Sequence, residues 1–218
     1  MDNVKIVFNP SERNINEIET WSTEKTYLHQ CYRSNNLVVA EYNNYTVGFY
    51  CLTELDEIIV KIETAETHSD FRRKGIARFI FNEIQKKYKN HYAFILDFSS
   101  SESKTYWENI GFSHSQNYVD SQNQMFKLTR PANEIFTKDS SNTIEIIDNF
   151  GKGFKWCFEL KENRNELITP IIFFGFNEWK MILTLNNKIL FNEEYKYFDD
   201  DNDITSCIFI KSIPYRYI

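Results

Sequence analysis

The spacing of apolar and polar residues divides the first 130 residues into segments typical of strands and helices. Residues 4–8, VKIVF, predict a first strand, and the next segment, with a Pro-Ser start and apolar residues on one face, predicts a helix. Residues 36–67 predict three consecutive strands, with turns at Asn43-Asn44 and near residues 54–57. Strands joined by such short turns are expected to form an antiparallel meander.

A second amphipathic pattern follows residues 71–75 and continues to about Lys89. Its apolar residues recur at helical spacing, so a helix with one buried face is expected. That face comprises Ile76, Ala77, Ile80, Phe81, Ile84 and Tyr88. Beyond this helix, the pattern predicts a buried strand over residues 93–98, a short helix with a serine-rich start over residues 99–110, and one or two further strands.

The pattern changes after residue 130. Residues 131–142 are polar and contain proline, which is typical of a linker. Residues 143–218 alternate short apolar runs with turn residues, and the spacing within them does not predict a helix. The sequence therefore predicts two domains, residues 1–130 and 143–218. The second is expected to be a small all-β domain, either a sandwich or a partly open barrel.

The amino-acid composition narrows the classes of molecule that the protein is expected to bind. The chain has 218 residues, 42% of them hydrophobic and 17% aromatic, which is ample for packed cores. Its net charge of −6 argues against nucleic acid, whose binding depends on neutralising phosphates, and favours a cationic or neutral small substrate. No apolar stretch approaches the roughly 20 residues of a membrane span, and the N-terminus lacks the apolar core of a signal peptide. We therefore expect a cytoplasmic protein that does not bind a membrane.

The spacing of the cysteines and histidines does not predict a metal site. The cysteines are scattered without a CxxC pair and mostly lie in apolar runs, so we expect reduced core residues instead of disulfides or zinc ligands. The histidines show no metal-ligand spacing. These residues are Cys31, Cys51, Cys157 and Cys207, and His29, His68, His91 and His114.

The stretch FRRKGIA, residues 71–77, places three cations before a glycine at the start of a predicted helix. A helix N-terminus already carries about four free N–H groups and the positive end of the helix dipole, so cations are disfavoured there unless an anion lies among them. Glycine lets the backbone approach a ligand, and successive N–H groups at a helix start form a nest for an anion. Taken by itself, the stretch also fits a solvated basic turn.

Two motifs in order resemble the GCN5-related N-acetyltransferase (GNAT) family. The central signature of this family is Q/R-x-x-G-x-G/A, matched here by Arg72, Gly75 and Ala77. The second signature is a helix ending in aromatic-Tyr-x-x-x-Gly-Phe, which corresponds to residues 106–112, YWENIGF. The resemblance extends over about residues 1–130. It implies an α/β (α+β) domain with a mixed, mostly antiparallel sheet flanked by helices.

The resemblance also implies how acetyl-CoA is held. Backbone N–H groups of the turn would bind the pyrophosphate, and the preceding strand would pair with the pantetheine arm and polarise the thioester carbonyl. A polar residue that opens the later helix would contact pantetheine as well. On this chain the implied cofactor-binding residues are Ala65, Thr67, Arg72, Arg73, Lys74, Gly75, Ile76, Ala77, Ser100 and Ser101.

The chain departs from the family at the residue that protonates the leaving thiolate. In many members a tyrosine four residues before the glycine of Gly-Phe has this role, and Trp107 stands at that position here. Indole is not an acid near neutral pH, which leaves the adjacent Tyr106 as the candidate. Tyr106 is displaced by about 100° around the helix and is expected to point elsewhere unless the register slips by one residue. A thiol, with a pKa of about 8.5, is a tolerable leaving group even without an acid.

An amine acceptor arrives as ammonium and must lose a proton before it attacks. The candidate bases are Glu63, Glu66 and His68, on or beside the strand that precedes the turn. Strand alternation places Glu63 on the same face as Thr67 and Glu66 on the other face, so Glu63 is favoured. Each carboxylate also fits a solvated or ion-paired strand residue.

The expected function is transfer of an acetyl group from acetyl-CoA to a primary amine by direct attack in a ternary complex. The acceptor classes are a small amine, an amino-acid-like metabolite or a protein amine. The alternative is a catalytically inactive CoA-binding scaffold or protein-interaction protein, in which Trp107 marks lost chemistry and the β domain carries the function. Acetylation of aminoacyl-tRNA is disfavoured by the net charge. The β domain is expected to shape the acceptor site, to form a homodimer or to bind a protein partner.

Overall fold

The computed structural model divides into two compact units, one N-terminal and one C-terminal. The N-terminal unit contains the described residues up to 129, and the C-terminal unit contains those from 141 onward. Residues 131–140, most of the predicted linker, lie outside the described residues. The structure describes residues 3–55, 58–114, 123–129, 141–148, 151, 153–162, 164–175, 178–196 and 206–213.

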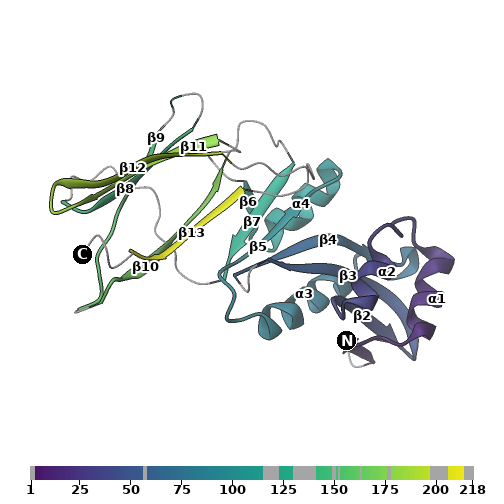
Figure 1. Cartoon of the computed structure of the whole chain (residues 1–218). Coiled ribbons are helices and arrows are strands. Elements are labelled where there is room, and N and C mark those ends of the chain that lie inside the picture. Colours follow the sequence, from purple (N-terminus) through teal and green to yellow (C-terminus); the bar gives the residue numbers. More distant parts are fainter. Residues whose placement is uncertain are drawn as a thin grey trace. The chain divides into compact units, whose positions relative to one another are not determined.

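The N-terminal unit is built on a seven-stranded sheet with the strand order β1-β2-β3-β4-β5-β7-β6 (Figure 1). Neighbouring strands are antiparallel except for β4 and β5, which are parallel. This confirms the mixed, mostly antiparallel sheet expected from the sequence. The strands are β1 (Val4–Val7), β2 (Leu37–Tyr42), β3 (Tyr45–Leu55), β4 (Ile59–Thr67), β5 (Ala93–Asp97), β6 (Ser113–His114) and β7 (Gln124–Leu128).

The hairpin between β2 and β3 turns at the two asparagines that the sequence marks. Asn43 and Asn44 adopt left-handed backbone conformations, with φ of 49° and 66°. A two-residue type I′ hairpin requires positive φ at both central residues, and asparagine tolerates it better than other residues except glycine. The predicted first turn is confirmed, whereas the second turn falls mainly on residues 56 and 57, outside the described residues.

Helices cover both faces of this sheet and bury a separate apolar core on each. On one face, Ile18 and Leu28 of the first two helices pack against Phe49 of β3. On the other face, Phe81 and Trp107 belong to a larger core with residues of β2 to β5. The short second helix is not apparent in the sequence pattern. The helices are α1 (Glu12–Trp21), α2 (Leu28–Arg33), α3 (Ile76–Lys87) and α4 (Ser101–Asn109).

Helix α3 follows its predicted apolar stripe closely. Its residues Ile80, Phe81 and Ile84 are at most 1% exposed, and burying each such side chain contributes about 1.5–3 kcal/mol. The helix also approaches the sheet closely at Gly48 of β3. A Cβ atom on Gly48 would lie 3.2 Å from Cδ1 of Ile80 and 3.3 Å from Cγ2 of Ile76. A glycine at this position therefore lets α3 lie directly on the strand.

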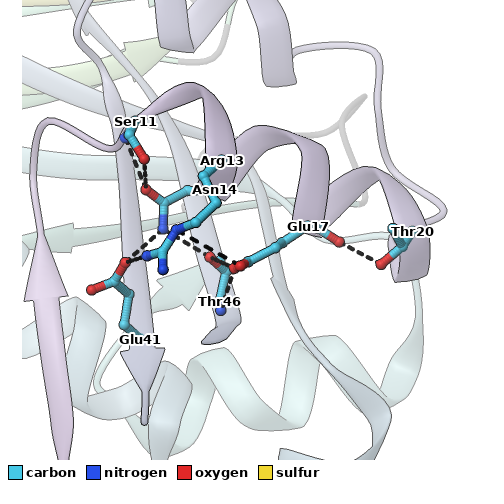
Figure 2. A network of polar contacts seen from close by, with 7 residues as sticks. All are labelled: Ser11, Arg13, Asn14, Glu17, Thr20, Glu41 and Thr46. Carbon is cyan, nitrogen blue, oxygen red and sulfur yellow. Dashed lines mark hydrogen bonds and ion pairs between the residues drawn. The ribbon is translucent and has the colours of Figure 1, made fainter. Parts of the chain in front are cut away.

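Helix α1 is fastened to β2 and β3 by a network of polar contacts (Figure 2). Asn14 donates through Nδ2 to Oε1 of Glu41, at 2.8 Å, and to Oγ1 of Thr46, at 2.9 Å. Arg13 forms an ion pair with Glu41, and Glu17 accepts hydrogen bonds from the backbone and hydroxyl of Thr46. A buried carboxylate is costly unless it is paired and hydrogen-bonded. These partners therefore allow Glu41 to be only 8% exposed.

The C-terminal unit contains β-strands and no helix among its described residues. A four-stranded sheet has the order β12-β11-β8-β9, and β10 pairs with β13 in a second sheet (Figure 1). Ile146 and Trp156 of the first sheet share one core with Ile171 of the second, as in a sandwich. The all-β prediction is confirmed. The strands are β8 (Thr143–Asp148), β9 (Gly153–Cys157), β10 (Glu166–Gly175), β11 (Glu178–Leu185), β12 (Lys188–Lys196) and β13 (Ser206–Ser212).

Candidate functional site

Strand β4 contains one extra residue relative to β3, the strand with which it pairs. Leu52 of β3 pairs with Ile62, but the neighbouring Cys51 pairs with Thr64. Glu63 is therefore the extra residue of a β-bulge, which bends the strand and interrupts its alternation.

The bulge changes which side chains of β4 share a face. Ile62 and Ala65 both contact the core under α3, although their spacing of three residues predicts opposite faces. Thr67 is two residues beyond Ala65 and therefore shares its face. Glu63 lies instead with Lys61, whose Nζ is 3.1 Å from Oε2 of Glu63. The expectation that Glu63 and Thr67 share a face is wrong, because it assumed an unbroken strand.

The parallel pairing of β4 with β5 stops partway along β4. Ile62 and Leu96 are the last paired residues, and β4 continues beyond them from Glu63 to Thr67. A strand edge without a neighbouring strand presents backbone N–H and C=O groups that can pair with an extended, amide-containing molecule. The bulge therefore lies where the two strands separate.

The turn between β4 and α3 has the backbone geometry of an anion nest. Arg73 and Gly75 adopt left-handed conformations, with φ of 61° and 79°, and Gly75 is the N-cap of α3. The first N–H groups of a helix have no acceptor within it, and they lie at the positive end of its dipole. The first turn of α3 contains no acidic residue that would compete for them. The turn is therefore suited to a phosphate group.

A cavity of about 1020 Å³ is lined by this turn, the open edge of β4 and the start of α4. It collects all of the predicted cofactor-binding residues except Lys74 and Ser101. Lys74 lies with Nζ 5.0 Å from the centre of the Phe71 ring, and Ser101 is the residue after the N-cap Ser100. Trp107, which stands at the position of the family's proton donor, lines the cavity as well. Further lining residues that sequence reasoning missed are Tyr50, Ser69, Phe71, Arg78, Glu102 and Ser103.

Glu66 is held at this cavity by partners on two sides. Its Oε2 accepts a hydrogen bond of 2.6 Å from the hydroxyl of Ser22, which follows α1. Its Oε1 lies 3.7 Å from Nη2 of Arg72, and the Arg72 Nε donates to the Thr67 carbonyl at 3.2 Å. The Glu66 side chain is 14% exposed. It is therefore both oriented and partly shielded from water.

The three candidate bases occupy different places. Among the described residues, Glu66 lines the cavity and Glu63 and His68 do not. The His68 ring packs edge-on against Trp21, with ring centres 5.3 Å apart, and its Nδ1 accepts from the Asp70 backbone. Geometry therefore favours Glu66 over the other two residues.

Tyr106 and Trp107 both reach the cavity, but in different ways. Trp107 is 6% exposed, and its ring packs edge-on against Tyr50 and Phe81 in the core. The Tyr106 hydroxyl lies 3.1 Å from the Tyr50 hydroxyl. Burial raises the pKa of the Tyr106 phenol, while the Tyr50 hydrogen bond and the charge of Arg78 act to lower it. Tyr106 therefore keeps its proton at neutral pH.

A second cavity, of about 850 Å³, lies beside α1 and the β2–β3 hairpin. It was not expected from the sequence. Aromatic residues such as Trp21, Tyr42 and Tyr45 line it, together with Arg13 and Glu17 from the network in Figure 2. The polar contacts that Arg13 and Glu17 already make favour a structural role for them over acid–base chemistry.

Within the described residues, no group of three or more His, Cys, Asp or Glu side chains could hold a metal ion. Cys31, Cys51 and Cys157 are not joined in disulfide bonds. No helix in the described part of the chain is long and apolar enough to cross a membrane.

The sequence also matches a known protein family. Residues 10–126 match the family described as the acetyltransferase (GNAT) domain, which is more than half of the chain. The chain therefore belongs to the GNAT acetyltransferase family. No characterised protein sequence matches it significantly.

Solved structures share the fold at low sequence identity. A GNAT-family acetyltransferase from Staphylococcus aureus Mu50 is 13% identical and has a TM-score of 0.50, over 58% of this chain and 99% of that one. An Elizabethkingia anophelis GNAT acetyltransferase with acetyl-CoA bound is 19% identical, with a TM-score of 0.46, over 59% and 99%. PaiA N-acetyltransferase from Thermoplasma acidophilum, in complex with coenzyme A, is 14% identical, with a TM-score of 0.46, over 57% and 98%.

Proposed function

We propose that the N-terminal unit transfers an acetyl group from acetyl-CoA to a primary amine, with both substrates bound at once. The observation that carries this proposal is the composition of the larger cavity, where the turn at Gly75, the open edge of β4 and Tyr106 meet. Acetyl-CoA has a pyrophosphate, an amide-containing arm and a thiol leaving group. An anion nest, a strand edge and a proton donor correspond to these three parts.

The binding residues follow from this correspondence. The N–H groups from Gly75 to Ala77 bind the pyrophosphate, with positive charge from Arg73 beside them. The backbone of β4 from Ala65 to Thr67 pairs with the arm. Ser100 is the N-cap of α4 and lines the same cavity, where it contacts the arm. Bound acetyl-CoA supplies the activated acetyl group.

The proton transfers are assigned to Glu66 and Tyr106. Glu66 accepts a proton from the ammonium form of the acceptor, because only the neutral amine attacks. The amine nitrogen then bonds to the acetyl carbon and becomes positively charged. It loses its second proton to solvent, the carbon–sulfur bond breaks, and the electron pair of that bond stays on sulfur. Tyr106 gives its phenolic proton to that sulfur. Solvent afterwards removes the proton from Glu66 and restores the one on Tyr106, so the overall reaction yields an amide and a free thiol.

The first test is calorimetric titration with acetyl-CoA of the wild type, Gly75→Asp and Gly151→Asp. Gly151 has a φ of 80°, close to that of Gly75, but belongs to the C-terminal unit. A carboxylate at position 75 crowds and repels the pyrophosphate, so affinity is expected to fall at least about tenfold in Gly75→Asp only. An unchanged affinity of Gly75→Asp for acetyl-CoA would contradict the assignment of this turn to cofactor binding.

The second test measures thiol release from acetyl-CoA with spermidine, lysine ethyl ester, tyramine and a peptide with a free N-terminus. Turnover with any of these amines supports the acetyltransferase. Tight binding of acetyl-CoA without turnover on these amines or on whole lysate would favour an inactive CoA-binding scaffold instead.

A further inference from the structure

Tyr50 is a buried tyrosine whose hydroxyl contacts the proposed proton donor. It lies on β3 and is 0% exposed, and its ring is part of the core under α3. Its hydroxyl is 3.1 Å from that of Tyr106 and donates to the Ala77 carbonyl at 3.2 Å. Tyr50, Tyr106 and Ala77 all line the larger cavity. The pair therefore joins the core of the sheet to the site of the proposed chemistry.

Counting protons shows that this pair has two arrangements. A phenol carries one proton, so Tyr50 donates either to the Ala77 carbonyl or to the Tyr106 oxygen. In the first arrangement, Tyr106 donates its proton to the Tyr50 oxygen, so that proton does not point into the cavity. In the second, Tyr106 accepts from Tyr50 and its own proton is free to point into the cavity. Helix geometry supplies the Ala77 carbonyl with the amide of Phe81, so it keeps a donor when Tyr50 turns away.

We infer that Tyr50 is a positioning residue for acetyl transfer: it donates a hydrogen bond to the Tyr106 oxygen while Tyr106 gives its proton to the departing sulfur. This inference rests on the proposed function. It assigns to a strand residue a part of the chemistry that neither signature motif contains. The proton moves from the Tyr106 oxygen to sulfur. The resulting phenolate accepts a hydrogen bond from the Tyr50 hydroxyl, which keeps its own proton.

The pKa values of the phenol and the thiol explain why a hydrogen bond from Tyr50 to the Tyr106 oxygen matters. A phenol has an ordinary pKa of about 10 and a thiol one of about 8.5, so transfer to the thiolate is unfavourable by about 30-fold at equilibrium. Burial of Tyr106 makes its phenolate still less favourable. A hydrogen bond to a charged oxygen is among the stronger ones in proteins. The Tyr50 hydroxyl therefore offsets part of the cost at the atom where the charge develops.

The direct test is a titration of Tyr106 in protein labelled at the tyrosine ring carbon, followed by NMR. Tyr106→Phe identifies the signal, and the titration is repeated in Tyr50→Phe and in Tyr88→Phe. Tyr88 is a tyrosine of the same core, 2% exposed, that does not line the cavity. The pKa of Tyr106 is expected to rise in Tyr50→Phe and to stay unchanged in Tyr88→Phe. An unchanged Tyr106 pKa in Tyr50→Phe would overturn the inference, and this arm needs neither an acceptor nor turnover.

The second arm is a double-mutant cycle on thiol release, using the amine of the panel that is turned over fastest. Tyr50→Phe is expected to lower kcat about tenfold, the lower end of the range for a hydrogen bond to a charged group, with the Kd for acetyl-CoA unchanged. In the Tyr106→Phe background it is expected to cause no further loss. Equal losses in both backgrounds would show that Tyr50 acts independently of Tyr106, which contradicts the inference. Calorimetry on the same variants separates this outcome from a failure to bind acetyl-CoA.

Discussion

The hydroxyl of Ser22 lies 2.6 Å from Oε2 of Glu66 and joins the end of α1 to strand β4. Ser22 is the C-cap of α1, so the length of that helix decides where its hydroxyl lies. Arg72 holds the other carboxylate oxygen from the turn before α3. The position of the proposed base therefore depends on two segments on either side of β4, and not on β4 by itself.

We predict that Glu66→Gln lowers kcat for acetyl transfer by about 100-fold, the lower part of the range for loss of a general base. The amide keeps the shape of the side chain but cannot accept the proton of the ammonium. The Kd for acetyl-CoA is expected to change little. Steady-state kinetics with a panel amine and calorimetry measure the two quantities separately.

The matched control for this prediction is Glu63→Gln, on the same strand. Glu63 is paired with Lys61 and does not line the cavity, so its substitution is expected to change kcat less than about threefold. A larger loss in Glu63→Gln than in Glu66→Gln would reverse the assignment of the base.

We predict that Gly75→Ala and Gly151→Ala both destabilise the protein by about 1 kcal/mol, because each glycine has a left-handed backbone that disfavours a Cβ atom. Only Gly75→Ala is expected to weaken acetyl-CoA binding, since Gly151 is in the C-terminal unit. Urea unfolding and calorimetric titration check the two parts. Equal affinities for acetyl-CoA in the two variants would show that the turn does not bind the cofactor.

We predict that Asn14→Ala lowers the free energy of unfolding by about 2 kcal/mol. Asn14 is 2% exposed, and its amide donates to Glu41 and Thr46, so its loss removes a partner from a buried carboxylate. Asn16, an exposed residue of the same helix, provides the control. Asn16→Ala is expected to change stability by less than about 0.5 kcal/mol in urea unfolding. Similar losses in the two variants would contradict a stabilising role for the network in Figure 2.

We predict that, because of Tyr50, the free energy of unfolding decreases as the pH rises above about 10. Burial raises the pKa of Tyr50 well above its ordinary value, so the folded state keeps a proton that the unfolded state loses above about pH 10. The free energy of unfolding then falls by about 1.4 kcal/mol per pH unit for this group, starting at the unfolded pKa. Below that pH the stabilisation is fully present.

Urea unfolding between about pH 9 and about pH 11 measures this slope. Tyr50→Phe is expected to flatten it relative to wild type, whereas Tyr45→Phe, at a residue that is 70% exposed, is expected to leave it unchanged. Parallel slopes for wild type and Tyr50→Phe would mean that Tyr50 ionises equally in both states.

Local sequence features predicted much of the N-terminal unit. The helical spacing of apolar residues predicted α3, and the pair Asn43-Asn44 predicted the turn between β2 and β3, because both features depend on backbone preferences over a few residues. Gly75 was expected directly before α3, and it is the N-cap of that helix. The six-residue helix α2 was missed, since it is too short to show a helical period.

Other features of the site were decided by tertiary structure. The bulge at Glu63 exists only in the pairing of β4 with β3, so no inspection of β4 by itself could place Glu63 and Thr67 on opposite faces. Tyr50 and Tyr106 are 56 residues apart in sequence and meet because the sheet and α4 share one core. The sequence by itself therefore determined most of the elements, the turn at Asn43-Asn44 and the family, all of which depend on short-range patterns. The tertiary structure decided which carboxylate and which hydroxyls face the cavity, because strand pairing and core packing set those directions.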